Sequence, residues 1–194
     1  MNEHIKRCQW ALRSDEEILY HDTQWGRPVF DDELLFEMLV LEMMQAGLSW
    51  TTILKKREAM TIAFDGFDVQ KIAKYNEAKI LELLENKEII RNRRKLEAMV
   101  NNAKCFINVQ REHGSFSEYL WSQVNHQVLH NGWTNEEDIP SSSPLSNELS
   151  KDLKRKGFKF VGPVIMYAYL QAVGVINDHL QSCFCYDEIA HLRS

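Results

Sequence analysis

Two cysteines and two histidines, one of each near either end of the chain, have side chains that bind zinc. Cys8 and His21 lie near the N-terminus, and His179 and Cys183 lie four residues apart near the C-terminus. On a helical turn, residues four apart project from the same face and can share a metal ion. Two thiolates and two imidazoles make a closed tetrahedral site with no position left for water. The residues therefore predict a structural zinc ion that joins the two ends of the chain.

The spacing of these residues leaves alternatives open. Cys185 or His191 can replace one of the ligands, and a His-x-x-x-Cys pair also arises from unrelated core and surface residues. The chain has four cysteines. In a reducing compartment they do not indicate a disulfide framework, so metal binding or burial is the prediction for them.

Glu42 is the one acid in the apolar run LEMMQAGLSW. The helical period places it on the same face as Leu35, which points it toward the interior. The alternative is an exposed acid at a frayed helix end. The flanking segments contain Tyr20, Trp25 and Trp50, and an acid among aromatic rings is a good receptor for a flat, positively charged ligand.

Basic residues gather in three stretches, although the formal net charge of −5 argues against a polyanionic partner. The stretches are Lys55 to Arg57, then Arg91, Arg93, Arg94 and Lys95, then Lys151, Lys154, Arg155, Lys156 and Lys159. Each one alone is typical of a solvated helix face. Together they predict a surface that follows a phosphate backbone.

The elements that position these residues are helices. Apolar residues recur with a period near 3.6, and no run alternates for long enough to predict a sheet, so we expect an all-α fold. Asp31 or Asp32 can cap a helix that runs to about Gln45, with Gly47 in a left-handed conformation after its end, and Ser49 can cap the next helix. Further helices are expected to begin at Asp68 and to cover 76–86, 92–113 and 116–124, and 135–146 is expected to be a surface loop.

The last third of the chain predicts a helix-hairpin-helix. A helix from about Asn147 ends at Gly157, a tight turn follows, and Pro163 takes the first position of a second helix, where its missing N–H costs nothing. Free backbone N–H groups near Gly162 can bind a phosphate, and Lys159 lies beside them. An ordinary helical hairpin with a glycine turn is the alternative.

Length and composition predict one globular domain over residues 1–194. With 44% hydrophobic residues the chain can bury a core. No apolar run reaches the roughly 18 residues that span a membrane, and the N-terminus has no signal-peptide pattern. We therefore expect a cytoplasmic protein with no membrane partner, and, from its size, a monomer.

Four motifs in a fixed order resemble the type I 3-methyladenine DNA glycosylases. They are YHDTQWG (20–26), LFEMLVLEMMQAGLSWTTILKKRE (35–58), ELSKDLKRKGFKFVGP (148–163) and NDHLQSCFCY (177–186). The resemblance implies a helix-hairpin-helix DNA glycosylase-like fold with a structural zinc ion. It also implies an enzyme that flips 3-methyladenine out of alkylated double-stranded DNA and hydrolyses its glycosidic bond, with free 3-methyladenine and an abasic site as products.

The resemblance also assigns roles to residues. Glu42 is implied to be the catalytic and base-binding acid, and Tyr20 and Trp50 are implied to bind the base with it. Trp25 is added to the base-binding residues because it is one of the aromatic residues in the flanking segments. DNA contacts are implied at Gln45, Gly47 and Leu48, where the turn wedges into the gap left by the flipped nucleotide, and the hairpin adds the expected phosphate contacts at Lys159 and Gly162. The zinc ligands carry over as Cys8, His21, His179 and Cys183. No lysine occupies an evident nucleophile position, so hydrolysis without strand cleavage is expected.

Two positions depart from related patterns. Many members of this family have a tyrosine three residues before the Tyr-His pair, and Glu17 occupies that position here. In the wider helix-hairpin-helix superfamily a catalytic aspartate follows the hairpin. Asp178 lies in the matching segment, and we expect it to support His179 instead.

Two other functions remain possible from the residues. A zinc-stapled helical module that binds DNA without catalysis shares every feature except a working Glu42 pocket. A zinc hydrolase requires an open coordination position at the metal, which four protein ligands would exclude.

Overall fold

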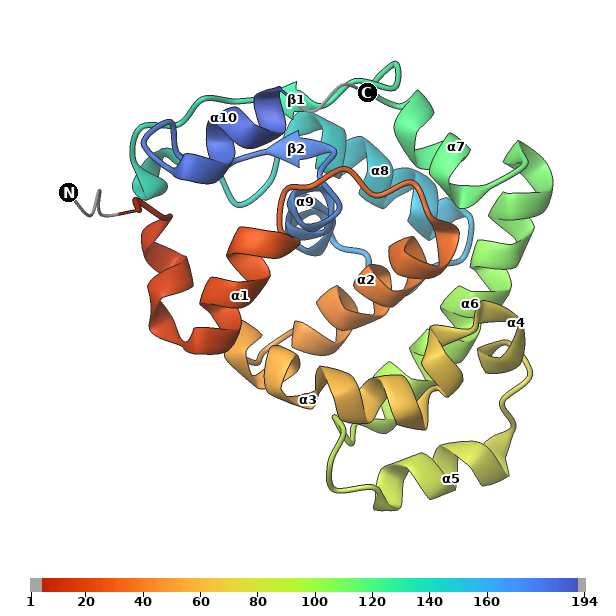
Figure 1. Ribbon diagram of the computed structural model, residues 1–194. Helices are drawn as coiled ribbons and strands as arrows, with labels where there is room; N and C mark the ends of the chain where they lie inside the picture. Colours follow the sequence, from red (N-terminus) through yellow and green to blue (C-terminus); the bar gives the residue numbers. More distant parts are fainter. Residues whose placement is uncertain (1–4, 192–194) are drawn as a thin grey trace.

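The computed structural model describes residues 5–191 and is mostly helical, with almost no sheet (Figure 1). Its helices are α1 (Asp15–Thr23), α2 (Asp32–Gln45), α3 (Trp50–Ala63), α4 (Val69–Ile72), α5 (Glu77–Glu85), α6 (Arg93–His113), α7 (Phe116–Ser122), α8 (Pro144–Arg155), α9 (Pro163–Ala172) and α10 (Phe184–Ala190). Short 3-10 helices are η1 (Gln9–Arg13), η2 (Asp65–Phe67) and η3 (Glu136–Asp138). The prediction of a helical fold is confirmed.

Side-chain caps begin the helices that carry the central motif. The Asp31 carboxylate accepts the Leu34 N–H at the start of α2, and the Ser49 hydroxyl accepts the Thr52 N–H at the start of α3. Gly47 lies between the two helices with φ at +79°, in the left-handed region that favours glycine. These caps and this turn confirm the predicted break.

Helix α9 runs through the middle of the molecule and packs against α8 and α2 (Figure 1). Its residues Met166, Tyr169 and Leu170 are fully buried. The Tyr169 hydroxyl donates to the carbonyl of Leu35 in α2, at 3.1 Å. Because the first residue of α9 closes the hairpin and its other end precedes the C-terminal turn, this helix connects the hairpin to the site described below.

The loop after α1 packs closely on the end of α9. Gly174 has φ at +72°, and a Cβ placed there would lie 2.3 Å from the carbonyl carbon of Arg27. Only glycine fits at this position. The Val29 N–H also donates to the carbonyl of Val173, at 3.1 Å, so the backbone after Trp25 is fixed against α9.

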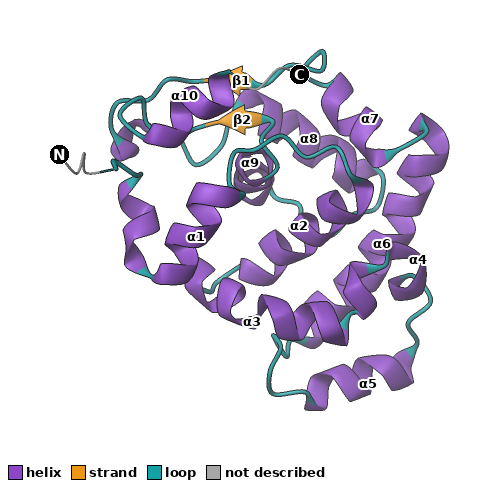
Figure 2. Cartoon of the chain, viewed as in Figure 1, coloured by secondary structure: helices purple, strands orange, loops and turns teal. Residues whose placement is uncertain are grey.

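Helices α1 and α10 were not among the predicted helices, and neither was a pair of two-residue parallel strands (Figure 2). Strands β1 (Leu129–His130) and β2 (Ile176–Asn177) align Leu129 with Ile176 and His130 with Asn177. The pair ties the segment after α7 to the segment before His179.

The hairpin begins earlier than the sequence predicted. Helix α8 starts at Pro144, not near Asn147, because Ser143 and Ser146 form a reciprocal capping box and Pro144 takes the first helical position. The expected loop over 135–146 is therefore shorter, and η3 lies within it. Gly157 ends the helix with φ at +93°, and Gly162 caps α9 before Pro163, as predicted.

No helix within residues 5–191 combines the length and apolar character that crossing a membrane would require.

Candidate functional site

The four predicted metal ligands come together in a buried cluster. Cys8, His21, His179 and Cys183 are each at most 2% exposed, and their donor atoms all lie within 4.8 Å of one another. The Cys183 sulfur lies 3.5 Å from His21 Nε2 and 3.5 Å from His179 Nδ1. Two sulfurs and two imidazole nitrogens in this arrangement can hold a metal ion with four protein ligands.

The hydrogen bonds of the two imidazoles fix which nitrogen faces the cluster. His179 Nε2 lies 3.1 Å from the carbonyl oxygen of Trp25, and a carbonyl only accepts, so Nε2 carries the hydrogen. His21 Nδ1 lies 2.8 Å from the carboxylate of Asp22, which Arg7 also holds. The lone pairs of His21 Nε2 and His179 Nδ1 are thereby left for the metal, as is usual around such sites.

Two details of the predicted cluster were wrong. His179 lies in irregular backbone and Cys183 is the N-cap of α10, so the pair meets across a turn and not on a helical face. Asp178 does not hydrogen-bond His179. Its carboxylate accepts from Asn131 and Trp133 at one oxygen, and from Tyr167 and Gln171 at the other.

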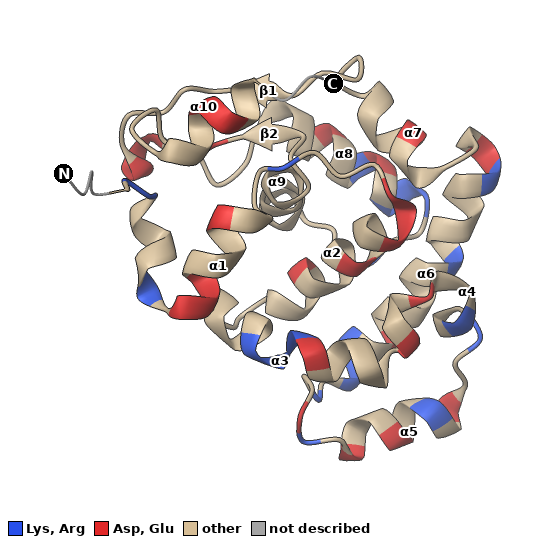
Figure 3. Cartoon of the chain, viewed as in Figure 1, with Lys and Arg blue, Asp and Glu red and all other residues tan. Residues whose placement is uncertain are grey.

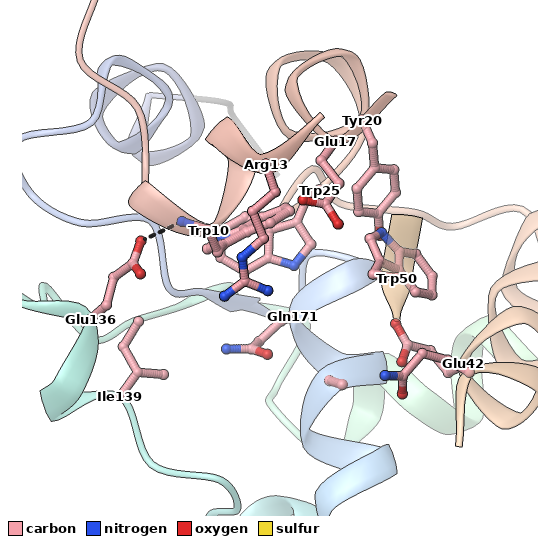
Figure 4. Close-up of a pocket in the computed structure, with 12 residues that line it drawn as sticks. Trp10, Arg13, Glu17, Tyr20, Trp25, Glu42, Trp50, Glu136, Ile139 and Gln171 are labelled. Atoms are coloured by element: carbon pink, nitrogen blue, oxygen red, sulfur yellow. Dashed lines mark hydrogen bonds between the residues drawn. The ribbon is translucent and has the colours of Figure 1, made fainter. Parts of the chain in front are cut away.

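A cavity of about 400 Å³ lies beside this cluster (Figure 4). A space of this size suits a small organic ligand. Its lining residues are Trp10, Arg13, Glu17, Tyr20, Trp25, Glu42, Gln45, Trp50, Glu136, Ile139, Ala168 and Gln171. All four residues predicted to bind the base, and Gln45, are among them. Trp25 lies between the two sites, since its ring centroid is 4.5 Å from that of His179.

Glu42 lies in the last turn of α2 with its side chain turned to the cavity, and the residue is 6% exposed. The alternative of an exposed acid at a frayed helix end is therefore excluded. Burial raises the pKa of the Glu42 carboxyl from 4.5 to about 8, because the charged form loses its hydration. No residue of the described part of the chain forms an ion pair with it.

The aromatic wall of the cavity contains polar atoms without partners. Tyr20 and Trp50 pack with ring centroids 5.2 Å apart and planes tilted by 55°. The Tyr20 hydroxyl, the Trp50 indole Nε1 and Glu17 Oε2 are buried without a hydrogen-bond partner. Burial, together with the nearby Glu42, raises the pKa of Tyr20 above its usual range. Unpaired buried polar atoms cost free energy, and a ligand that pairs with them recovers it.

The turn after Glu42 is held from behind by a buried lysine. The Lys95 ammonium donates to the carbonyl oxygens of Met44 and Ala46, at 2.9 and 2.7 Å. Gln45 Nε2 donates to the Leu48 carbonyl at 2.8 Å, which closes the turn, and the Leu48 side chain is 38% exposed. Leu48 is thereby presented to solvent on a fixed backbone.

The hairpin is anchored to α6 and leaves Lys159 free. The Asn102 side chain accepts the Lys159 N–H at 2.8 Å and donates to the Lys159 carbonyl at 2.9 Å. The Lys159 side chain is exposed and forms no ion pair within residues 5–191. Gly47, Leu48, Lys159 and Gly162 lie outside the cavity lining, so the predicted DNA contacts and the base-binding residues occupy different surfaces, apart from Gln45.

Most of the predicted phosphate surface is occupied by internal contacts. Lys95 is 5% exposed, which excludes it from a phosphate contact. Both α3 and α5 carry basic and acidic residues (Figure 3). The basic residues of the three stretches that pair with acids are Lys55 with Glu16, Arg57 with Glu37, Arg93 with Glu77 and Glu97, Lys151 with Glu148, Arg155 with Asp152 and Lys156 with Glu112. Half of the basic residues in the three stretches therefore pair with acids of the protein itself, as is usual on a solvated helix face.

Six lining residues were not predicted from the sequence, and they are Trp10, Arg13, Glu136, Ile139, Ala168 and Gln171. Trp10 lies in η1 and packs edge-on against Trp25, with ring centroids 5.0 Å apart. Its place two residues after Cys8 was a signal that the aromatic set extended further. Arg13 and Gln171 gave no such signal, because only the folded chain brings η1 and α9 to the same cavity (Figure 4).

Comparisons with known proteins give one consistent result. Residues 10–186 match the family model described as methyladenine glycosylase. The chain is 43% identical over 182 residues to DNA-3-methyladenine glycosylase 1 of Escherichia coli, covering 94% of this chain and 97% of that protein.

Solved structures agree with this match. A crystal structure of 3-methyladenine DNA glycosylase I aligns with a TM-score of 0.90 and 43% identity, over 93% of this chain and 100% of that one. A second, a variant of 3-methyladenine DNA glycosylase I in complex with 3-methyladenine, aligns with a TM-score of 0.89 and 39% identity, over 92% and 96% of the two chains.

Proposed function

The chain belongs to the methyladenine glycosylase family, as its motifs predicted, and from this premise we propose that it is a DNA repair enzyme that removes 3-methyladenine from alkylated double-stranded DNA. Residues 1–194 act as one glycosylase domain, a monomer working in the cytoplasm. The observation that carries the proposal is the cavity itself, in which the buried carboxyl of Glu42 lies among tryptophan and tyrosine rings.

The cavity suits the chemical nature of the damaged base. An adenine methylated at N3 while attached to deoxyribose is a flat cation. Aromatic faces attract a cation, and a carboxylate deprived of water attracts it more strongly than one in solvent. Glu42 therefore binds the extruded base, with Tyr20, Trp25 and Trp50 around it, and these contacts offset the few kcal/mol that flipping costs.

The charge of the base also explains why one acid is enough. The positive charge on the base weakens the glycosidic bond. When the bond breaks, its electron pair stays with the base and neutralises that charge, so the departing 3-methyladenine needs no proton. Glu42 is a catalytic residue because it holds the reacting base in place, and not because it donates a proton. Water then attacks the sugar cation and leaves an abasic site.

The second site holds zinc in this proposal. Cys8, His21, His179 and Cys183 supply four donors, and their two outer imidazole nitrogens are already paired. When bound, the ion stabilises the junction of the two chain ends and performs no chemistry, because four protein ligands leave no position for water or substrate. This argues against a zinc hydrolase.

Contacts to DNA in this proposal come from two exposed elements. The turn of Gln45, Gly47 and Leu48 fills the space that the flipped nucleotide leaves, since Leu48 presents an apolar side chain on a fixed backbone. The start of α9 at Gly162 and the ammonium of Lys159 bind backbone phosphates.

A base-release assay tests the proposal. Alkylated DNA is incubated with the metal-loaded protein or with the Glu42→Gln variant, and free methylated bases are quantified. We expect the variant to lose roughly 10- to 100-fold in kcat/KM, the value of a hydrogen bond to a charged group. Glu37→Gln, on the same helix but paired with Arg57 outside the cavity, is the control.

The result separates this function from its alternative. If the metal-loaded wild-type protein binds DNA but releases no 3-methyladenine, the proposal is wrong. The chain would then be a zinc-stapled DNA-binding module without catalysis.

A further inference from the structure

Glu17 is a second buried carboxylate in the cavity wall. It lies on α1, one turn before Tyr20, and is 2% exposed. Its Oε1 accepts a hydrogen bond from the Thr51 hydroxyl at 2.7 Å, and its Oε2 is buried without a partner. The carboxylate therefore has one oxygen used by the fold and one oxygen left unused.

No positive group of the protein compensates this carboxylate. Across residues 5–191, Glu17 forms no ion pair with a lysine, arginine or histidine. Arg13 lines the same cavity, but its guanidinium lies toward Gln171, whereas Glu17 lies toward Tyr20 and Trp50 (Figure 4). A buried carboxylate with free lone pairs and no cation is costly, so a ligand that supplies positive charge is favoured there.

The two cavity carboxylates come from different elements. Glu42 projects from α2 and Glu17 from α1, with Trp50 between them in the view of Figure 4. Counting Glu136, three carboxylates and one guanidinium line the cavity, so its formal charge is negative. A base that enters is exposed to negative charge from more than one side.

We infer that Glu17 determines the selectivity of the cavity for positively charged bases over neutral ones, as a second counter-charge beside Glu42. The inference rests on the proposed function. A neutral adenine gains no Coulomb attraction from Glu17, whereas a base methylated at N3 is attracted by both carboxylates. Undamaged adenines, which far outnumber damaged ones, are thereby excluded.

The same charge also predicts when Glu17 acts. The base keeps part of its positive charge in the transition state and loses it only once the bond is broken, so Glu17 stabilises the bound substrate and the transition state to a similar extent and the departing base much less. It is therefore a specificity residue that lowers KM and helps the neutral product to leave, and it does not accelerate the chemical step.

Ligand binding measures this selectivity directly. The permanently cationic 3,9-dimethyladeninium and the neutral 9-methyladenine are titrated into wild-type protein, Glu17→Gln and Glu16→Gln, with tryptophan fluorescence as the signal. Glu17→Gln keeps the size of the side chain and an oxygen for Thr51. Glu16→Gln removes the same charge one residue away, where Glu16 is half exposed and faces Lys55.

We expect Glu17→Gln to reduce the cation-to-neutral affinity ratio about tenfold, while Glu16→Gln leaves it unchanged. In base release, Glu17→Gln raises KM and leaves kcat within about twofold of wild type. An unchanged affinity ratio in Glu17→Gln overturns the inference, and so does an equal loss for both ligands, which indicates a structural role. A wild-type protein that releases no base refutes the proposed function instead.

Discussion

The metal cluster and the base cavity share a wall at Trp25, yet the outer polar atoms of the cluster have hydrogen-bond partners and several buried polar atoms of the cavity have none. In the cluster the outer nitrogen of each imidazole is paired, to Asp22 or to the Trp25 carbonyl, and the inner donors converge within 4.8 Å. In the cavity the Glu42 carboxyl has no cation, and the Tyr20, Trp50 and Glu17 side chains each have an unpaired buried atom.

The metal cluster therefore stabilises the fold, whereas the cavity destabilises it and depends on the rest of the fold to compensate. A cluster with four converging donors lowers the free energy of the native state when it binds its ion. The cavity raises that free energy until a ligand arrives, because its polar atoms are buried and unpaired. Substitutions at the two sites should therefore change stability in opposite directions.

The largest effect is expected at the cluster. Cys183→Ala removes one of four metal ligands, and we expect the melting temperature to fall by more than about 10 °C, with loss of bound zinc. Thermal unfolding and metal content by mass spectrometry measure both. Cys105→Ala is the control, since Cys105 is half-buried and outside the cluster. A Cys183→Ala protein that binds zinc and melts like wild type would break the comparison, and Cys185 would then be tested as the ligand.

The second effect is expected at Glu42 and has the opposite sign. The folded-state pKa of Glu42 is raised from 4.5 to about 8, so between these pH values the folded state binds more protons than the unfolded state. The contribution of this group to stability therefore falls as pH rises through that window. We expect Glu42→Gln to be more stable than wild type by about 1–3 kcal/mol above pH 8, and less so near pH 5, measured by urea unfolding. An equal difference in stability between Glu42→Gln and wild type at both pH values would contradict a raised pKa for the Glu42 carboxyl.

The ionisation of Glu42 should also change the affinity for a cationic ligand with pH. A cationic base favours ionised Glu42, so binding of 3,9-dimethyladeninium should release a proton below about pH 8. Its affinity should rise with pH up to that value and then level off. The Glu42→Gln variant should show a flat profile.

A third effect is expected at Lys95. Its buried ammonium has hydrogen-bond partners, like the polar atoms of the metal cluster, although it supports the turn beside the cavity. Lys95→Met leaves the carbonyls of Met44 and Ala46 without their donor. We expect a loss of about 1–3 kcal/mol in stability and about tenfold in base release from DNA. Affinity for free 3-methyladenine should stay within about twofold, because Gly47 and Leu48, the proposed DNA contacts of this turn, lie outside the cavity lining. A parallel loss for free base would show that the whole of α2 had moved.

The smallest effect is expected at Lys159, which is exposed and contributes to neither site. Lys159→Ala should weaken DNA binding severalfold, reduce the salt dependence of binding by about one ion, and leave melting temperature and free-base affinity unchanged. Glu148→Gln, on the exposed face of α8, is a surface control. An unchanged salt dependence would remove Lys159 from the DNA surface.

The sequence was most informative where structure is local. Asp31, Ser49, Gly47 and Pro163 act as caps, turn and helix start through contacts within a few residues, and each was predicted in place. The two-residue strands were not predicted, because their pairing joins segments 47 positions apart and neither strand is long enough to show alternation.

The site was only partly predictable for a related reason. The family resemblance named Glu42, Tyr20 and Trp50, the aromatic residues near Glu42 added Trp25, and the ligand residue types named the metal cluster. The burial of Lys95 could not be read from its sequence neighbours, since it lies among arginines and is covered only by the tertiary contact to α2. The unpaired oxygen of Glu17 likewise depends on which atoms surround it in the fold.

The metal cluster also determines when the protein becomes functional during its synthesis. Cys8 and His179 are separated by 171 positions, so the ligand set is incomplete until almost the whole chain has left the ribosome. Trp25 hydrogen-bonds His179, and the wall of the cavity therefore cannot be fixed before that moment. Contacts so distant along the chain form late in folding. A chain that lacks its C-terminal turn therefore has its Glu42 helix but no completed cavity wall.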